Sequence, residues 1–220
     1  MNIQTLIDLA NNSVYPAQGL MALYGVFCVI LVLRRIRQKG FGSHQAAEQF
    51  LEETRADLAE RRFDDIAQRC DSPRYWAKAV PQLMLVALAN QDRDRAGLRR
   101  LLAEKFEREV LADLEYRMSW INTVIKSEPM LGLLGTVLGM ISAFGKIAGS
   151  GKSGVDPQTL ANDISFALWT TAIGLIIAIP LIVCMSMIQV RLSRMQDGVQ
   201  QYLGEFLEAF DAARQPPKGR

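Results

Sequence analysis

The sequence predicts an all-α integral membrane protein with three transmembrane helices, a helical cytoplasmic insertion, and a long helix that continues into the second span. Two observations carry this prediction. Apolar residues gather in three long blocks, and nearly all the charge lies outside them, between positions 34 and 126 and after position 191. A helix of about 20 mainly apolar residues is long enough to cross a bilayer, so each block qualifies with its flanks.

The first block, "AQGLMALYGVFCVILVL", runs from Ala17 to Leu33 without a charge. It lacks a basic segment before it and a small-residue cleavage site after it, so we interpret it as a membrane helix and not as a secretory signal. The basic run Arg34 to Lys39 follows. Because cytoplasmic flanks are rich in Lys and Arg, this end of the helix is predicted to face the cytoplasm.

The charged segment that follows is predicted to be a helical cytoplasmic region. Its apolar residues recur near helical spacing, and Pro73 disfavours helix at Ser72, so a break is expected there. From Asp92 to Lys126 the sequence has almost no helix breaker, which predicts one helix running straight into the second span. We identify neither a serine–histidine–acid set nor paired catalytic carboxylates here, and the sequence therefore predicts no enzyme.

The second and third apolar blocks complete a single topology. The third span is followed by Arg191 and Arg194, whose charge predicts a cytoplasmic end. The N-terminus then faces outward and the C-terminus faces the cytoplasm. The predicted segments are 1–15 (external), 16–34 (first span), 35–127 (cytoplasmic helices), 128–148 (second span), 149–162 (short periplasmic loop), 163–190 (third span) and 191–220 (cytoplasmic helix, with a disordered tail after Asp211).

The stretch "KIAGSGKSG", Lys146 to Gly154, resembles a phosphate-binding loop. The loop pattern requires a first glycine, a strand before it and a helix after it. Here Lys146 replaces that glycine, a predicted membrane helix precedes the stretch, and the loop is predicted to face outward. We therefore expect no nucleotide binding and interpret Lys146 and Lys152 as polar ends of the loop.

Composition excludes several other partners and cofactors. The net charge of +2 is too small to suggest nucleic acid. Cys28, Cys70 and Cys184 are scattered, and His44 is the only histidine. This pattern supports neither a disulfide framework nor a metal site, so no metal and no cofactor are predicted.

Small residues form one stripe on each of the last two spans. Lipid supplies little drive for helix association, so close packing relies on such residues. Each stripe also carries one hydroxyl, which leaves two interpretations: helix packing with each threonine bonded to its own helix, or a polar pore lining. The second span contributes Gly132, Thr136, Gly139 and Ala143, with Gly135 as a further packing residue, and the third contributes Ala167, Thr171, Gly174 and Ala178.

Two other residues of the third span have separate predictions. Thr170 is expected to face an aliphatic surface with Ile173 and Ile177, away from the stripe. Pro180 removes a backbone donor and is expected to bend the helix near Ile176. The three charge-free blocks contain no Asp, Glu, Lys, Arg or His, and proton relays in membranes usually need such a group. A proton-conducting chain of this kind would take its acid from a partner.

The stretches "GLLGTVLGMISAFGKI" and "ISFALWTTAIGLIIAIP" resemble the MotA/TolQ/ExbB proton-channel family. The likeness covers roughly residues 108 to 210 and is nearest to the three-span ExbB and TolQ branch, because MotA proteins have four spans. It implies a motor subunit of the bacterial inner membrane, with its N-terminus in the periplasm, that forms a ring, typically a pentamer, around the helices of two ExbD- or TolR-like partners. The partner's intramembrane aspartate binds the proton, and the proton motive force is converted into mechanical work on the envelope.

The resemblance places Thr136 and Thr171 at the pore-lining threonines of the family, which favours the pore interpretation. Two positions depart from the family pattern. Phe166 stands where ExbB and TolQ often have glutamate, and Asp163 is the candidate channel-mouth acid in its place, with a helix N-cap as the alternative. Glu128 stands where an apolar residue is usual. A non-conducting scaffold of the same fold is the alternative function, and a membrane ATPase is a weaker third.

Overall fold

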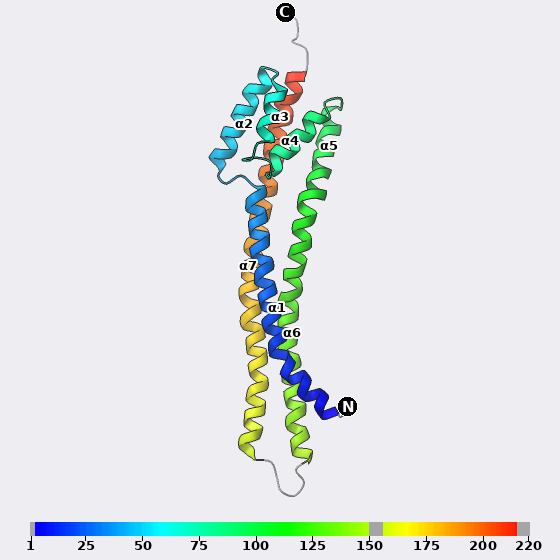
Figure 1. Ribbon diagram of the computed structural model, residues 1–220, viewed down its shortest axis with the longest axis vertical. Coiled ribbons are helices and arrows are strands. Elements are labelled where there is room, and N and C mark those ends of the chain that lie inside the picture. Colours follow the sequence, from blue (N-terminus) through cyan, green and yellow to red (C-terminus); the bar gives the residue numbers. More distant parts are fainter. Residues whose placement is uncertain (1–2, 150–155, 215–220) are drawn as a thin grey trace, which may run out of the picture. The chain divides into compact units, whose positions relative to one another are not determined.

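The computed structural model describes the backbone of residues 3–149 and 156–214, and their side chains from residue 13 onward. Every regular element in these ranges is a helix (Figure 1), which confirms the predicted all-α class. The elements are α1 (Ile3–Lys39), α2 (His44–Ala59), α3 (Phe63–Cys70), α4 (Ala79–Ala89), α5 (Arg95–Phe106), the π-helix η1 (Glu107–Leu111), α6 (Ala112–Gly149) and α7 (Pro157–Arg214).

Three helical stretches are long and apolar enough to cross a membrane, as predicted. They contain α1, α6 and α7, and each includes one internal proline: Pro16, Pro129 and Pro180. The helices extend beyond the predicted spans, since α1 already begins at Ile3 and α7 continues to Arg214. Where the bilayer begins and ends along them stays a prediction.

The helix that leads into the second span is continuous from Arg95 to Gly149. It consists of α5, a single π-helical turn and α6. The prediction that one long helix runs directly into this span is therefore confirmed, while its cytoplasmic location stays a prediction. The sequence did not predict the π-helical turn, in which Val110 is the buried residue.

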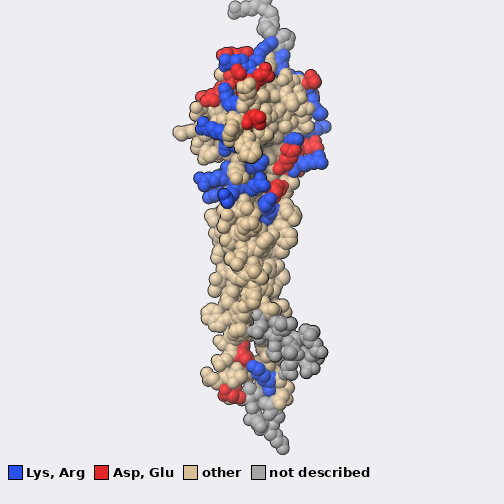
Figure 2. All heavy atoms as spheres, in the orientation of Figure 1, with Lys and Arg blue, Asp and Glu red and all other residues tan. Residues whose placement is uncertain are grey.

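The chain divides into two compact units. Unit 1 comprises Met1–Ile30 and Arg117–Met187, and unit 2 comprises Leu31–Tyr116 and Ile188–Arg220. In unit 1 the segments of α1, α6 and α7 lie side by side (Figure 1). Its outer surface carries large exposed apolar side chains such as Leu20, Met130 and Ile176, and Figure 2 shows a broad band without charged atoms. Such a surface is suited to lipid or to a neighbouring subunit.

Unit 2 has an aromatic and aliphatic core shared by the short helices and the end of α7. Ser43 caps α2 by accepting a hydrogen bond from the Ala46 amide at 3.2 Å, and the predicted break at Ser72 lies in the turns between α3 and α4. Fully buried core side chains include Phe50, Leu58, Ile66, Met84, Leu98, Leu102, Phe206 and Phe210.

The first residues of the tail predicted after Asp211 are helical. Helix α7 continues to Arg214, whose Nη1 donates to the carbonyl of Arg93 at 2.9 Å and whose guanidinium lies over the Phe210 ring. These contacts hold the last helical turn against unit 2, so the expectation of disorder is wrong for 212–214. The remaining tail lies outside the described residues.

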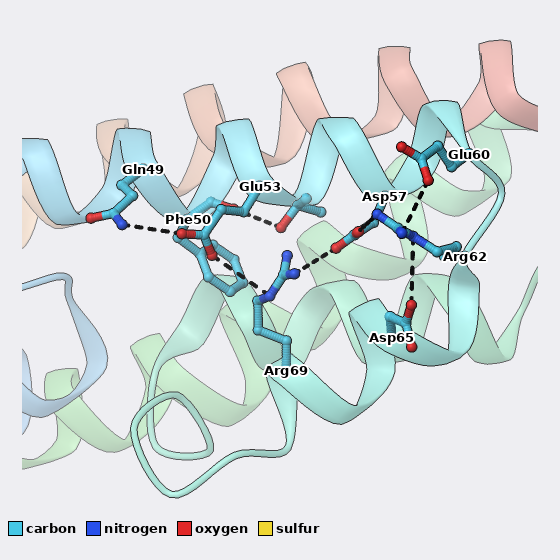
Figure 3. Close-up of polar contacts among 9 residues, drawn as sticks. Gln49, Phe50, Glu53, Asp57, Glu60, Arg62, Asp65 and Arg69 are labelled. Carbon is cyan, nitrogen blue, oxygen red and sulfur yellow. Dashed lines mark hydrogen bonds and ion pairs between the residues drawn. The ribbon is translucent and has the colours of Figure 1, made fainter.

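An ion cluster joins α2 to α3 in unit 2 (Figure 3). The Asp57 side chain is only 6% exposed and pairs with two guanidinium groups, Arg62 Nη2 at 2.7 Å and Arg69 Nη2 at 2.7 Å. Arg69 also lies 3.7 Å from Glu53. Because hydrogen bonds to charged groups are stronger than neutral ones, this buried carboxylate fixes the angle at which the chain turns from one helix into the next.

We expect Asp57→Asn to loosen α2 and α3. The amide loses the charge that both guanidinium groups share, so local opening of these helices becomes about ten-fold more frequent. Hydrogen exchange of their backbone amides measures this. The matched control is Asp65→Asn, since Asp65 is 56% exposed and lies 3.5 Å from Arg62, and it should leave the exchange nearly unchanged. Equal acceleration in both variants would contradict the importance of burial.

Candidate functional site

The small-residue faces predicted for the second and third spans meet each other in unit 1. A Cβ atom placed on Gly132 would lie 2.7 Å from the Cα of Thr171, and one on Gly139 would lie 2.5 Å from the Cβ of Ala167. A Cβ on Gly135 would overlap the Thr170 side chain. Helices α6 and α7 thus approach backbone to backbone, as small residues permit in lipid.

The remaining small residues of the two stripes are buried as well. Ala143, Ala167 and Ala178 are each 2% exposed. Gly174 packs where all three helices of unit 1 converge, since its Cβ would lie 2.6 Å from the carbonyl oxygen of Glu128 on α6 and 3.1 Å from Gln18 Nε2 on α1. The third helix therefore takes part in the same packing centre.

The expected orientation of Thr170 is wrong. Thr170 is fully buried, and its hydroxyl lies 2.9 Å from the carbonyl oxygen of Gly132 on α6 and 2.7 Å from that of Ala167 on its own helix. It therefore belongs to the packed face between α6 and α7 and not to an aliphatic surface. The bond to Gly132 is possible because the glycine lets the two backbones come close.

The two predicted pore-lining threonines have different surroundings. Thr136 donates to the carbonyl of Leu133 in its own helix at 2.7 Å, as the packing interpretation expects. The Thr171 hydroxyl is buried and has no hydrogen-bond partner among the residues that the structure describes. Thr171 is thus the threonine whose hydroxyl is free to serve a partner or a proton path, while the pore role of both stays a proposal.

At the far end of the two spans, Asp163 forms an ion pair with Lys146, with 2.6 Å between Oδ2 and Nζ. The alternative that Asp163 caps a helix is wrong, because α7 begins at Pro157 and Asp156 caps it instead. Asp156 accepts from the amides of Gln158 and Thr159 at 3.3 Å each, and these bonds, that of Gln158 first, hold the pKa of Asp156 below its ordinary value.

Phe166, the residue in place of the family's glutamate, stacks edge-on against Tyr15 of α1 with ring centroids 4.9 Å apart. The Tyr15 hydroxyl donates to the Phe166 carbonyl at 3.1 Å. An aromatic contact between α1 and α7 thus occupies this position. Pro180 is exposed on α7, and the bend expected there remains a prediction.

The glycine-rich stretch does not have the surroundings of a phosphate-binding loop where the structure describes it. Lys146 to Gly149 are the last turn of α6, whereas a phosphate loop follows a strand. Lys152 and the rest of the stretch lie outside the described residues. Among the described side chains no group of three or more His, Cys, Asp or Glu could hold a metal ion, and the lack of cofactors remains a prediction.

Two buried polar residues were not predicted as part of this site. Gln18 is 1% exposed and donates through Nε2 to the Thr170 carbonyl at 2.9 Å, and Glu128 is 0% exposed. Sequence offers one signal for each: a lone amide within an apolar block, and an acid placed directly before Pro129 at the start of a span. Neither signal reveals burial, because each residue stands at the edge of its block.

Comparison with known proteins assigns the family. The model of the MotA/TolQ/ExbB proton channel family matches residues 73–201. The chain is 34% identical over 114 residues to the Tol-Pal system protein TolQ of Haemophilus influenzae, covering 52% of this chain and 47% of TolQ. It is 50% identical over 52 residues to the biopolymer transport protein exbB1 of Vibrio cholerae, covering 24% and 22%.

A third relative, the biopolymer transport protein ExbB of Xanthomonas campestris, is 42% identical over 67 residues, which cover 30% of this chain and 26% of that protein. The chain thus spans less than half the length of each of these relatives. The family match includes α6 and most of α7, the two helices whose small-residue faces meet. The predicted resemblance, including the TolQ and ExbB branch, is confirmed.

These findings describe a multi-pass membrane protein from a family of channels and not of enzymes. Three apolar helices can span a bilayer, and the family model covers well over half of the chain. The chain belongs to the MotA/TolQ/ExbB proton channel family.

Proposed function

We propose that this chain is a subunit of a proton-driven motor in the bacterial inner membrane. With a single-span ExbD- or TolR-like partner, it converts the proton motive force into mechanical work on the cell envelope. Its N-terminus faces the periplasm and its C-terminus the cytoplasm.

The close pair of α6 and α7 is the observation that carries this proposal. The pair lies in the part matched by the channel family, and it buries the Thr171 hydroxyl without a partner among the described residues. Between positions 129 and 145 and between 164 and 187 there is no Asp, Glu, Lys, Arg or His. A proton path along this face therefore draws on an acid from elsewhere, and the aspartate of the partner is the proposed source.

We expect the chain to form a homo-oligomer, most simply a pentamer around two partner helices. Large apolar side chains such as Leu168 and Trp169 are 61% and 60% exposed on unit 1, which leaves surface for neighbouring copies as well as lipid. Native mass spectrometry in mild detergent, with and without the partner, measures the stoichiometry. A stable monomer under both conditions would rule out the ring.

Proton flux into liposomes tests the function itself. The chain is co-reconstituted with a single-span ExbD- or TolR-like protein, and a pH-sensitive dye reports uptake under an imposed potential. Uptake should require both proteins and should disappear when the partner's intramembrane Asp is changed to Asn. A fully assembled complex without proton uptake would support the non-conducting scaffold instead. Activity that requires a sodium gradient would show that the coupling ion is sodium and not the proton.

A further inference from the structure

Glu128 is a buried acid without a counter-ion. It lies near the predicted start of the second span and is 0% exposed, and neither carboxylate oxygen has a hydrogen-bond partner among the described residues. An ionised carboxylate left unpaired in apolar surroundings is strongly destabilised, whereas a protonated one is not. The geometry therefore favours the neutral acid, which carries one O–H donor.

Two other buried polar groups of unit 1 also lack a hydrogen-bond partner among the described residues. Gln18 of α1 and the Glu128 backbone lie against the same glycine, Gly174 of α7. Gln18 uses Nε2 for the Thr170 carbonyl, while its buried Oε1 has no partner among the described residues. The Thr171 hydroxyl, one helical turn before Gly174, is also buried and unpartnered there. A protonated Glu128 carries an O–H donor, which is the kind of partner that the buried acceptor Gln18 Oε1 lacks.

No described charge neutralises Glu128 from the helices packed against it. The side chains of α1 between positions 13 and 30 include no charged group, and neither do those of α7 between 164 and 187. On α6 the neighbouring charge is Lys126, which is exposed. The other titratable or charged side chains described in unit 1 are Tyr15, Tyr24 and Cys28 on α1, Arg117 and Lys146 on α6, Asp156 and Asp163 near the start of α7, and Cys184 further along α7.

We propose that Glu128 is a proton-binding site within this chain, additional to the acid of the partner. Binding forms an O–H bond on one carboxylate oxygen and consumes one proton from water. Release breaks that bond and leaves one negative charge. We assign Gln18 Oε1, a buried acceptor without a partner among the described residues, as the acceptor of the O–H in the protonated form. The inference deepens the proposed function, since it gives the subunit an acid of its own.

Labelling with dicyclohexylcarbodiimide tests the site directly. This apolar reagent reaches acids within membranes, and the O–H of a protonated carboxyl adds across its C=N bond to form a covalent adduct. The full chain in liposomes is labelled at a series of pH values and analysed by peptide mass spectrometry. We expect an adduct on Glu128 that is lost as the pH rises, and no adduct on Asp163, which forms an ion pair with Lys146.

Matched variants assign the signal. Glu128→Gln should abolish the adduct, whereas Glu115→Gln, which changes an exposed glutamate on the same helix, should leave it unchanged. The carboxylic C=O stretch in infrared spectra should vanish in the same variant and fade in the unaltered chain as the pH rises. If Glu128→Gln does not fold, the pH dependence of the Glu128 adduct in the unaltered chain still shows whether Glu128 binds and releases a proton.

The outcomes separate this inference from the proposed function. No adduct and no C=O band from Glu128 at any pH, with normal partner-dependent proton uptake, would overturn the inference and leave the motor intact. A pH-dependent adduct in a complex that takes up no protons would support the site and overturn the motor. An adduct that does not change with pH would show a permanently protonated structural acid, and the inference would fail.

Discussion

The variant Gly132→Ala will unfold at a lower temperature than the unaltered protein, although alanine favours helix over glycine by about 1 kcal/mol. The added Cβ would lie 2.7 Å from Thr171 Cα and 2.8 Å from the Thr170 carbonyl oxygen. Both are backbone atoms, so the contact is relieved only if α6 and α7 move apart. Overpacking and the weakened bond from Thr170 to Gly132 should together destabilise the protein by about 1–3 kcal/mol net.

Gly145→Ala is the matched control on the same helix. A Cβ at Gly145 meets nothing within 4 Å, so the substitution should leave the unfolding temperature unchanged or raise it slightly. Both variants are compared by size-exclusion chromatography after heating in one detergent. If the two substitutions shift the transition equally, the backbone contact between α6 and α7 does not limit stability.

The variants Thr171→Val and Thr170→Val should fail in different ways. Valine keeps the shape of threonine but removes its hydroxyl. At Thr170 this deletes the bond to the Gly132 carbonyl, so we expect lower stability and less assembled protein. At Thr171 no bond within the described chain is lost, so abundance should be preserved while proton coupling falls.

The expected loss of coupling in Thr171→Val is roughly 2- to 12-fold, the effect of one hydrogen bond of about 0.5–1.5 kcal/mol. This is a large fraction of the driving force, about 2.3 kcal/mol per charge per 100 mV. Proton uptake per assembled ring measures it, at equal membrane abundance of the two variants. Full uptake by a chain carrying both Thr136→Val and Thr171→Val would exclude a pore role for these hydroxyls.

The class, the three spans and the helix that enters the second span could all be predicted from the sequence. They depend on local properties: the length of a charge-free block, the position of basic flanks, and the lack of breakers between Asp92 and Lys126. A helix in lipid must satisfy its backbone groups internally. The composition along the chain is therefore sufficient to identify the spanning helices. The family motifs were also continuous in sequence, and for that reason the resemblance was visible.

The tertiary structure alone decided which threonine packs and which acid is buried. Residues three and four positions after Ala167 lie on either side of the same helical stripe. Spacing therefore does not tell whether Thr170 or Thr171 packs between α6 and α7. The close approach of Gly132 shows that it is Thr170 whose hydroxyl bonds across the two helices. Glu128 stands at the edge of an apolar block, where sequence suggests exposure, yet it is enclosed where Gln18 and Gly174 come together. Such burial depends on side chains brought by helices distant in sequence, and no local pattern encodes it.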